Sequence, residues 1–145
     1  MAKYNNVLVA VDGSEESKIA LKKALDLAKE NSASLTIVHI IDTRTFATIE
    51  QYDRTIVSRA ENYGQELLEQ YEEEAKQAGI EDVTTVIDFG SPKSKIPKDI
   101  AKQYNIDLII TGATGLNAVE RMLIGSVSEA IARQAACDVL IVRSP

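Results

Sequence analysis

Apolar residues along this chain fall into two alternating patterns. Five short runs rich in Val and Ile are largely continuous, and they span residues 7–12, 35–42, 83–89, 108–112 and 139–143. Continuous runs of this length are typical of strands that are covered on both faces. The sequence therefore predicts five buried strands.

The stretches between these runs repeat their apolar positions every three or four residues, which predicts helices. The expected helices span residues 15–30, 54–78, 92–104 and 126–135. Ser14 precedes the first helix as its expected N-cap, and Ser91 and Pro92 begin the third as cap and first helical position. Gly79 follows the second helix, where a C-cap glycine is common.

Strand and helix alternate throughout, which predicts an α/β fold: right-handed βαβ units that form a doubly wound parallel sheet with helices on both faces. One connection, residues 43–53, is longer than usual and carries Phe46, Ile49 and Tyr52. Two interpretations of it stay open, a lid or partner-contacting segment and a loop that covers the end of the sheet.

Composition narrows the class of protein. The chain has 145 residues, of which 45% are apolar, so we expect one domain over residues 1–145. Its formal net charge is −6 and it has no basic run, which argues against nucleic acid or a membrane surface as partner. A signal-peptide pattern and a spanning run of about 18 apolar residues are both missing. Cys137 is the only cysteine, so no internal disulfide forms, and we expect a cytoplasmic protein.

Residues 112–126 read GATGLNAVERMLIGS, and this stretch contains three glycines. Gly112 and Gly115 follow the carboxyl end of the fourth expected strand, where ligands of open α/β sheets bind. Gly125 and Ser126 open the last helix, where free N–H groups and the helix dipole favour an anion. The P-loop pattern and the GxGxxG pattern of dinucleotide-binding folds are both missing. The pattern present is G-x2-G-x9-G-S after the fourth expected strand. The glycine loop and the helix start would both offer backbone donors, which a phosphate chain needs.

This glycine pattern, the following VSEAIARQAACDVLIVR and the early VLVAVDGSEES closely resemble the universal stress protein family, in its ATP-binding branch. The resemblance covers essentially the whole chain. It implies five parallel strands in the order 3-2-1-4-5, and Mg-ATP at the ends of the first and fourth strands. It also implies a homodimer in many members.

The resemblance assigns site residues by motif match. Those that would border the adenine are Ala10, Val11, Asp12 and Ile40, the last through its backbone. Gly112 and Gly115 match the ribose and phosphate loop, and the phosphate-binding helix start matches Gly125, Ser126, Val127 and Ser128. Many members have a basic residue where this chain has Thr114, which removes one charge contact, and Arg121 is the nearest candidate to replace it.

Several of these residues also have a purely structural explanation. Ser126 and Glu129 fit a capping box, which explains the serine without a ligand. Asp12 fits an Asp-Gly turn into Ser14. His39 stands alone within a strand, which favours a structural histidine. Cys137 is expected to serve as a small packing residue.

Motifs of hydrolytic or metal enzymes are missing, so the favoured function is an ATP-binding stress or regulatory protein with slow ATP hydrolysis or none. One alternative is a dimeric interaction scaffold of the same fold without nucleotide. Another is a phosphoacceptor receiver domain, suggested by Asp12 and Asp88 at two strand ends. The last strand would lie at the sheet edge, so we expect a two-fold dimer through antiparallel contact of residues 139–142.

Overall fold

The computed structural model describes residues 4–42, 54–113 and 124–143. These residues form one α/β domain with a five-stranded parallel sheet in the order β3-β2-β1-β4-β5, which confirms the expected fold and strand order. The strands are β1 (Asn6–Ala10), β2 (Ser34–Asp42), β3 (Val83–Gly90), β4 (Leu108–Gly112) and β5 (Asp138–Val142). Apart from β1, which ends two residues before the predicted Asp12, each strand lies within one residue of its prediction.

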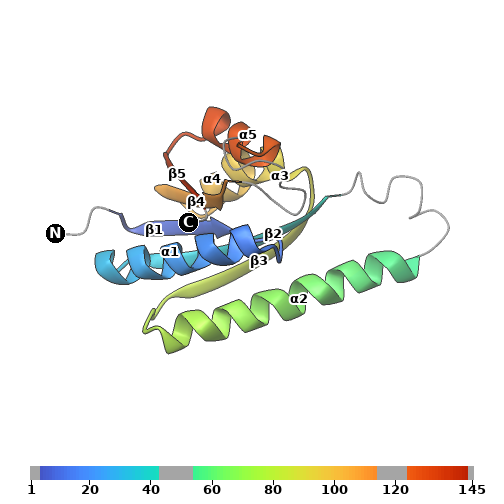
Figure 1. Ribbon diagram of the computed structural model, residues 1–145, viewed down its shortest axis with the longest axis horizontal. Coiled ribbons are helices and arrows are strands. Elements are labelled where there is room, and N and C mark those ends of the chain that lie inside the picture. The colour runs from blue at the N-terminus through green and yellow to red at the C-terminus, as the bar shows by residue number, and fades with distance from the viewer. Residues whose placement is uncertain (1–3, 43–53, 114–123, 144–145) are drawn as a thin grey trace.

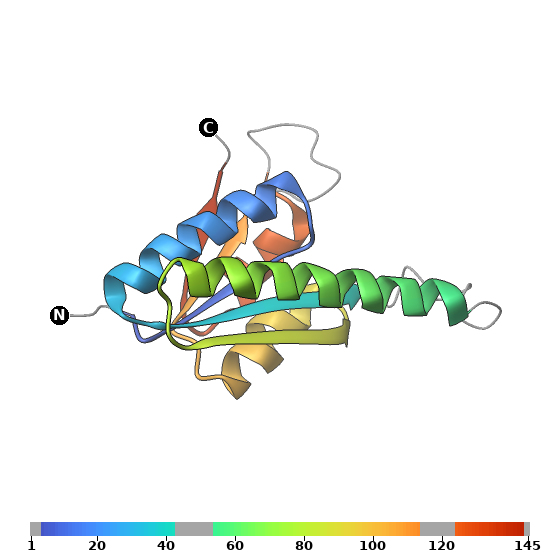
Figure 2. The same cartoon turned by 90° about the horizontal axis from the view of Figure 1, so that it is seen from below.

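Helices cover both faces of the sheet (Figure 1). They are α1 (Glu15–Asn31), α2 (Arg54–Gln77), the consecutive segments α3 (Pro92–Ser94), η2 (Lys95–Ile100) and α4 (Ala101–Gln103), and α5 (Ser126–Gln134). Helices α1 and α2 lie side by side on one face, as Figure 2 shows, and the others lie on the opposite face. Segment 43–53, for which a lid was one interpretation, lies outside the described residues.

Successive side chains of a strand point to opposite faces of the sheet, so the core has two parts, one on each face. In β1, Val7 and Val9 pack under α1 and α2, whereas Leu8 packs under η2 and α5 with Ile109 and Ile131. All five side chains are fully buried. Because both faces of the central strands need apolar side chains, their sequences are continuous rather than alternating. Within the described part of the chain, no helix is long and apolar enough to cross a membrane.

The third expected helix forms, and its middle widens into the π-helical segment η2. Pro97 lies inside this segment and is buried. Proline lacks the N–H that an α-helix needs at an interior position, and its ring crowds the preceding turn. A π-type turn accommodates both effects without ending the helix. The helix begins as predicted, with Ser91 as N-cap and Pro92 at its first position.

Candidate functional site

The strand order reverses at β1, which lies between β2 and β4. In doubly wound sheets the ligand binds beyond the carboxyl ends of the strands at this reversal. The residues found there are Asp12 after β1, Ile40 near the end of β2, Gly112 at the end of β4 and Gly125 at the start of α5. We call these strand ends and the start of α5 the candidate site.

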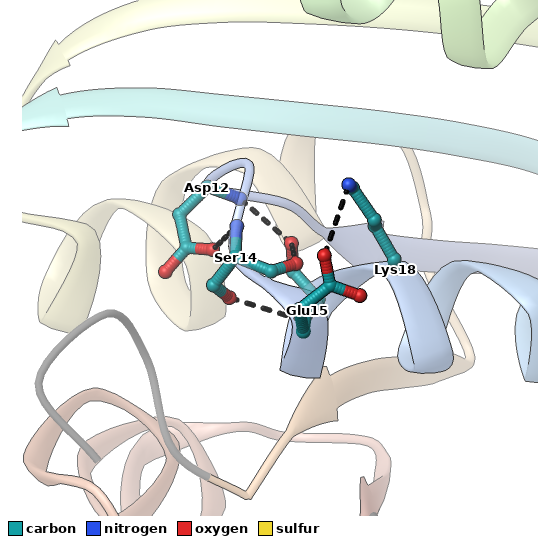
Figure 3. Close-up of polar contacts among 5 residues, drawn as sticks. Asp12, Ser14, Glu15 and Lys18 are labelled. Atoms are coloured by element: carbon teal, nitrogen blue, oxygen red, sulfur yellow. Dashed lines mark hydrogen bonds and ion pairs between the residues drawn. The ribbon is translucent and has the colours of Figure 1, made fainter.

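The turn from β1 into α1 is fixed by its own polar side chains (Figure 3). The Ser14 N–H donates to Asp12 Oδ1 at 2.9 Å, and the Asp12 N–H donates to Ser17 Oγ at 3.3 Å. Gly13 between them has a φ of +85°, a conformation that favours glycine. Ser14 caps α1, since its side chain accepts from the Ser17 N–H at 3.1 Å. The Asp-Gly turn predicted as an alternative role of Asp12 is therefore present.

Ala10 and Val11 lie at the carboxyl end of β1, next to the candidate site. Val11 is buried, and its side chain belongs to the core under α1 and α2. Ala10 is half-buried and packs against the core of the opposite face. The Val11 N–H donates to the Val38 carbonyl at 2.9 Å, so the pairing between β1 and β2 extends one residue past β1.

Ile40 presents its backbone at the point where β1 has ended. The N–H and C=O of one strand residue point to the same side of the strand, and the Val38 carbonyl faces β1. Two residues further on, Ile40 therefore directs its N–H and C=O to the same side, past the end of β1. Its side chain is buried on the α5 face. Ile40 thus offers one donor and one acceptor side by side.

Gly112 has a packing role that the sequence did not suggest. A Cβ at this position would lie 2.9 Å from the carbonyl oxygen of Glu16 and 3.0 Å from its carbonyl carbon. The missing side chain lets the first turn of α1 approach the end of β4. Among the expected site glycines, Gly112 is therefore required by the fold whether or not a ligand binds.

The start of α5 is held against the end of β4. The Gly125 N–H donates to the Ala113 carbonyl at 2.7 Å, and the Ser128 hydroxyl donates to the Gly112 carbonyl. Ser128 is buried, and its hydroxyl also lies 3.5 Å from Thr111 Oγ1. The side chain of Ser128 is thus engaged within the fold, and its backbone is the part that could face a ligand.

The capping box that the sequence suggested for Ser126 and Glu129 is wrong, because Ser126 is not the N-cap of α5. Gly125 is the N-cap, with φ −61° and ψ 156°, and Ser126 is the first helical residue. Since glycine has no side chain, none caps the helix from that position, and Glu129 forms an ion pair with Arg133 at 2.8 Å. The first N–H groups of a helix have no partner within it. Among the described residues, no group accepts a hydrogen bond from the Ser126, Val127 or Ser128 N–H, and Ser126 is exposed. These N–H groups are therefore candidates to bind an anion.

Three further predicted residues, Thr114, Gly115 and Arg121, lie outside the described residues. In the described ranges, no group of three or more His, Cys, Asp or Glu side chains could hold a metal ion.

The arrangement around Asp88 does not resemble an acidic phosphoacceptor site. Asp88 lies in β3, and β2 separates it from β1 and Asp12. Its carboxylate accepts from the Phe89 N–H at 2.8 Å and from Lys95 Nζ at 3.1 Å. The Phe89 N–H and the Lys95 charge lower the pKa of Asp88. Asp88 thus fastens the edge strand to η2, and the receiver-domain alternative loses its acidic pair.

His39 and Cys137 have the structural roles predicted for them. His39 is buried, and its Nδ1 lies 2.9 Å from the Val11 carbonyl oxygen. Cys137 is half-buried against the core of the α5 face, and burial raises the pKa of its thiol.

Sequence reasoning missed Tyr63 of α2, whose hydroxyl lies against Gly13. The sequence marked Tyr63 only as one position on the second expected helix.

Comparisons with known proteins agree with one another. A family model described as "Universal stress protein family" matches residues 3–143. Two proteins named as universal stress proteins, from Staphylococcus haemolyticus and Staphylococcus aureus (strain USA300), are 52% and 51% identical over 144 residues, which is 99% of this chain and 87% of each relative. Universal stress protein UspA from Lactobacillus plantarum has a TM-score of 0.89 at 29% identity, over 99% of this chain and 100% of the other. A universal stress protein solved in complex with cAMP has a TM-score of 0.77 at 28% identity, over 99% and 100% of the two chains.

Proposed function

Because the chain belongs to the universal stress protein family, we propose that it is an ATP-binding member with a regulatory or stress-response role. The nucleotide occupies the candidate site, with adenine at Ile40, Val11 and Asp12 and the phosphates at the start of α5. The related protein that was solved in complex with cAMP supports an adenine nucleotide as the class of ligand.

One observation carries the proposal: two sets of backbone groups lie on either side of the end of β1. On the β2 side, Ile40 directs a donor and an acceptor past the strand end, which matches the N1 and 6-amino groups of adenine. On the β4 side, the hydrogen bond from Gly125 to Ala113 brings the start of α5 to the end of β4. Helix N-termini bind phosphates through their N–H groups and dipole.

Mg²⁺ would enter with the phosphates. It prefers oxygen ligands and is commonly held by one or two carboxylates together with substrate phosphates. Asp12 is an acidic side chain at the candidate site, and one of its oxygens accepts a hydrogen bond from the Ser14 N–H. This donor set fits a cation bound through the nucleotide rather than in a protein cage. Bound there, Mg²⁺ would offset the phosphate charge.

We expect slow hydrolysis or none. The Asp12 carboxylate stabilises the β1–α1 turn, and the His39 Nδ1 is bonded to the Val11 carbonyl, so neither is placed as a free general base. A bound nucleotide would then act mainly by changing what the protein contacts. A cytoplasmic location stays a prediction from the sequence.

Calorimetric titration of the folded protein tests the proposal. We expect saturable heat with ATP and Mg²⁺, at one nucleotide per chain, and weaker binding when EDTA removes the cation, because the triphosphate then keeps its full charge. A titration with Mg-ATP that gives no binding heat at several temperatures would contradict the proposal. It would leave the nucleotide-free scaffold as the remaining function.

The second proposal is a homodimer through β5. This strand is an edge of the sheet, and its residues Val139–Val142 are only half-buried. An apolar strand edge with unpaired N–H and C=O groups favours pairing with another chain. We expect sedimentation to report a mass near twice that of the chain, and Leu140→Lys to shift it toward the monomer. A monomer mass at all concentrations would exclude the dimer.

A further inference from the structure

The pairing of β1 with β2 breaks off at Val11. In the parallel register Ala10 lies opposite Val38, so Val11 lies opposite His39. The next two ladder bonds are Val11 N–H to Val38 and Ile40 N–H to Val11. The first is present at 2.9 Å, and the second is missing among the hydrogen bonds of the described residues. The His39 Nδ1 takes its place at the Val11 carbonyl oxygen, at 2.9 Å.

This contact fixes the protonation of the ring. A carbonyl oxygen only accepts hydrogen bonds, so His39 Nδ1 must carry the hydrogen. The neutral ring is therefore the Nδ1–H tautomer. His39 is the only histidine in the chain, so its imidazole signals in an NMR spectrum need no assignment by mutation.

Helix α2 holds the ring in this position. A Cβ on Gly64 would lie 2.8 Å from His39 Cδ2, so the ring packs directly on the α2 backbone. Tyr63 meets the ring edge to face, with centroids 6.4 Å apart and planes at 67°. The Tyr63 hydroxyl lies where a Gly13 side chain would be, 1.9 Å from the ideal Cβ position. The side chains of Tyr63 and His39 therefore both pack against the end of β1 from the side of α2.

We propose that His39 is a positioning residue of the candidate site, held by Tyr63 and Gly64: by occupying the Val11 carbonyl, it keeps the Ile40 N–H free for the adenine ring. This assignment rests on the proposed function. It adds that a side chain buried behind the sheet decides whether the adenine donor is available. Without His39, the Ile40 N–H would complete the ladder with Val11 and be lost to the ligand.

The test compares His39→Leu with His39→Asn. Asparagine places its amide nitrogen as many bonds from Cβ as the imidazole Nδ1, so it keeps the donor, whereas leucine removes it. Without nucleotide, we expect the Ile40 amide of His39→Leu to exchange with deuterium at least about tenfold more slowly than in the wild type, since it gains a hydrogen bond. Mere destabilisation of the fold would speed this exchange.

Calorimetry on the same proteins gives the second readout. We expect His39→Leu to bind Mg-ATP about tenfold more weakly, the usual effect of one lost hydrogen bond, and His39→Asn to stay within about threefold of the wild type. The wild-type ring should show a protonated Nδ1 and an unprotonated Nε2 in its ¹⁵N signals when neutral.

Two outcomes separate the claims. Suppose that the wild type binds Mg-ATP. Equal affinities of His39→Leu and His39→Asn for Mg-ATP would then overturn the positioning role alone. Unchanged or faster exchange of the Ile40 amide in His39→Leu would do the same. No binding in the wild type would overturn the proposed function, and the positioning role with it.

Discussion

Replacing Ser126 with aspartate is expected to weaken Mg-ATP binding about a hundredfold without loss of stability. Ser126 is exposed at the first position of α5, beside N–H groups that have no partner within the helix. A carboxylate there repels the phosphates. The same carboxylate interacts favourably with the helix dipole, so the free energy of unfolding should stay the same or rise slightly.

The opposite directions of these two effects make the substitution informative. Calorimetry gives the affinity, and urea unfolding gives the stability of the same protein. Ser126→Asn is the matched control, because it has nearly the same shape without the charge and should bind within a few-fold of the wild type. Equal Mg-ATP affinities for Ser126→Asp and Ser126→Asn would place the phosphates away from α5.

Replacing Gly112 with alanine is expected to lower the free energy of unfolding by about 1–3 kcal/mol, the usual cost of overpacking. The added Cβ would lie 2.9 Å from the Glu16 carbonyl oxygen, a backbone atom that cannot move without shifting α1. Gly112 does not have a positive φ, so the effect comes from the contact rather than from the backbone conformation. Urea unfolding without nucleotide measures it.

Gly125→Ala is the control for that experiment. Like Gly112, Gly125 lies at the candidate site, where it directly precedes α5. Its φ of −61° suits any residue. The loss of a glycine N-cap should cost less than the clash at Gly112. If Gly112→Ala is as stable as the wild type, then α1 does not approach β4 as closely as described, and the glycine serves the ligand alone.

The fold was largely predictable because its signals are local. Continuous apolar runs mark buried parallel strands, and Ser14, Ser91 and Pro92 mark helix starts by side-chain chemistry that acts within a few residues. The strand order did not follow from these patterns. It came from the family resemblance, and the register of the sheet confirms it.

The errors lie where a local pattern competes with tertiary contacts. Ser126 and Glu129 have the spacing of a capping box, but the N-cap is Gly125, whose N–H donates to the Ala113 carbonyl. Ser126 is therefore the first residue of the helix rather than its cap. Similarly, Asp12 continues an apolar run, yet the strand ends at Ala10 and the Asp12 side chain accepts from the Ser14 N–H in the turn that follows.

Two features of the candidate site were beyond the reach of the sequence. The role of Gly112 depends on the distance between α1 and β4, which no pattern of residues encodes. The pairing of His39 with Val11 depends on the register of β1 against β2 and on the position of α2. Sequence reasoning identified His39 as structural, but only the register shows which hydrogen bond it replaces.

The most direct test of the central claim is an amide NMR titration of the folded protein with Mg-ATP. We predict that the largest shifts occur in two groups far apart in the sequence, at Val11 and Ile40 and at Ser126, Val127 and Ser128, and that they saturate together with one affinity. Such a result would place one nucleotide across the end of β1, between β2 and α5. An unchanged spectrum, or shifts confined to residues away from both groups, would contradict the account.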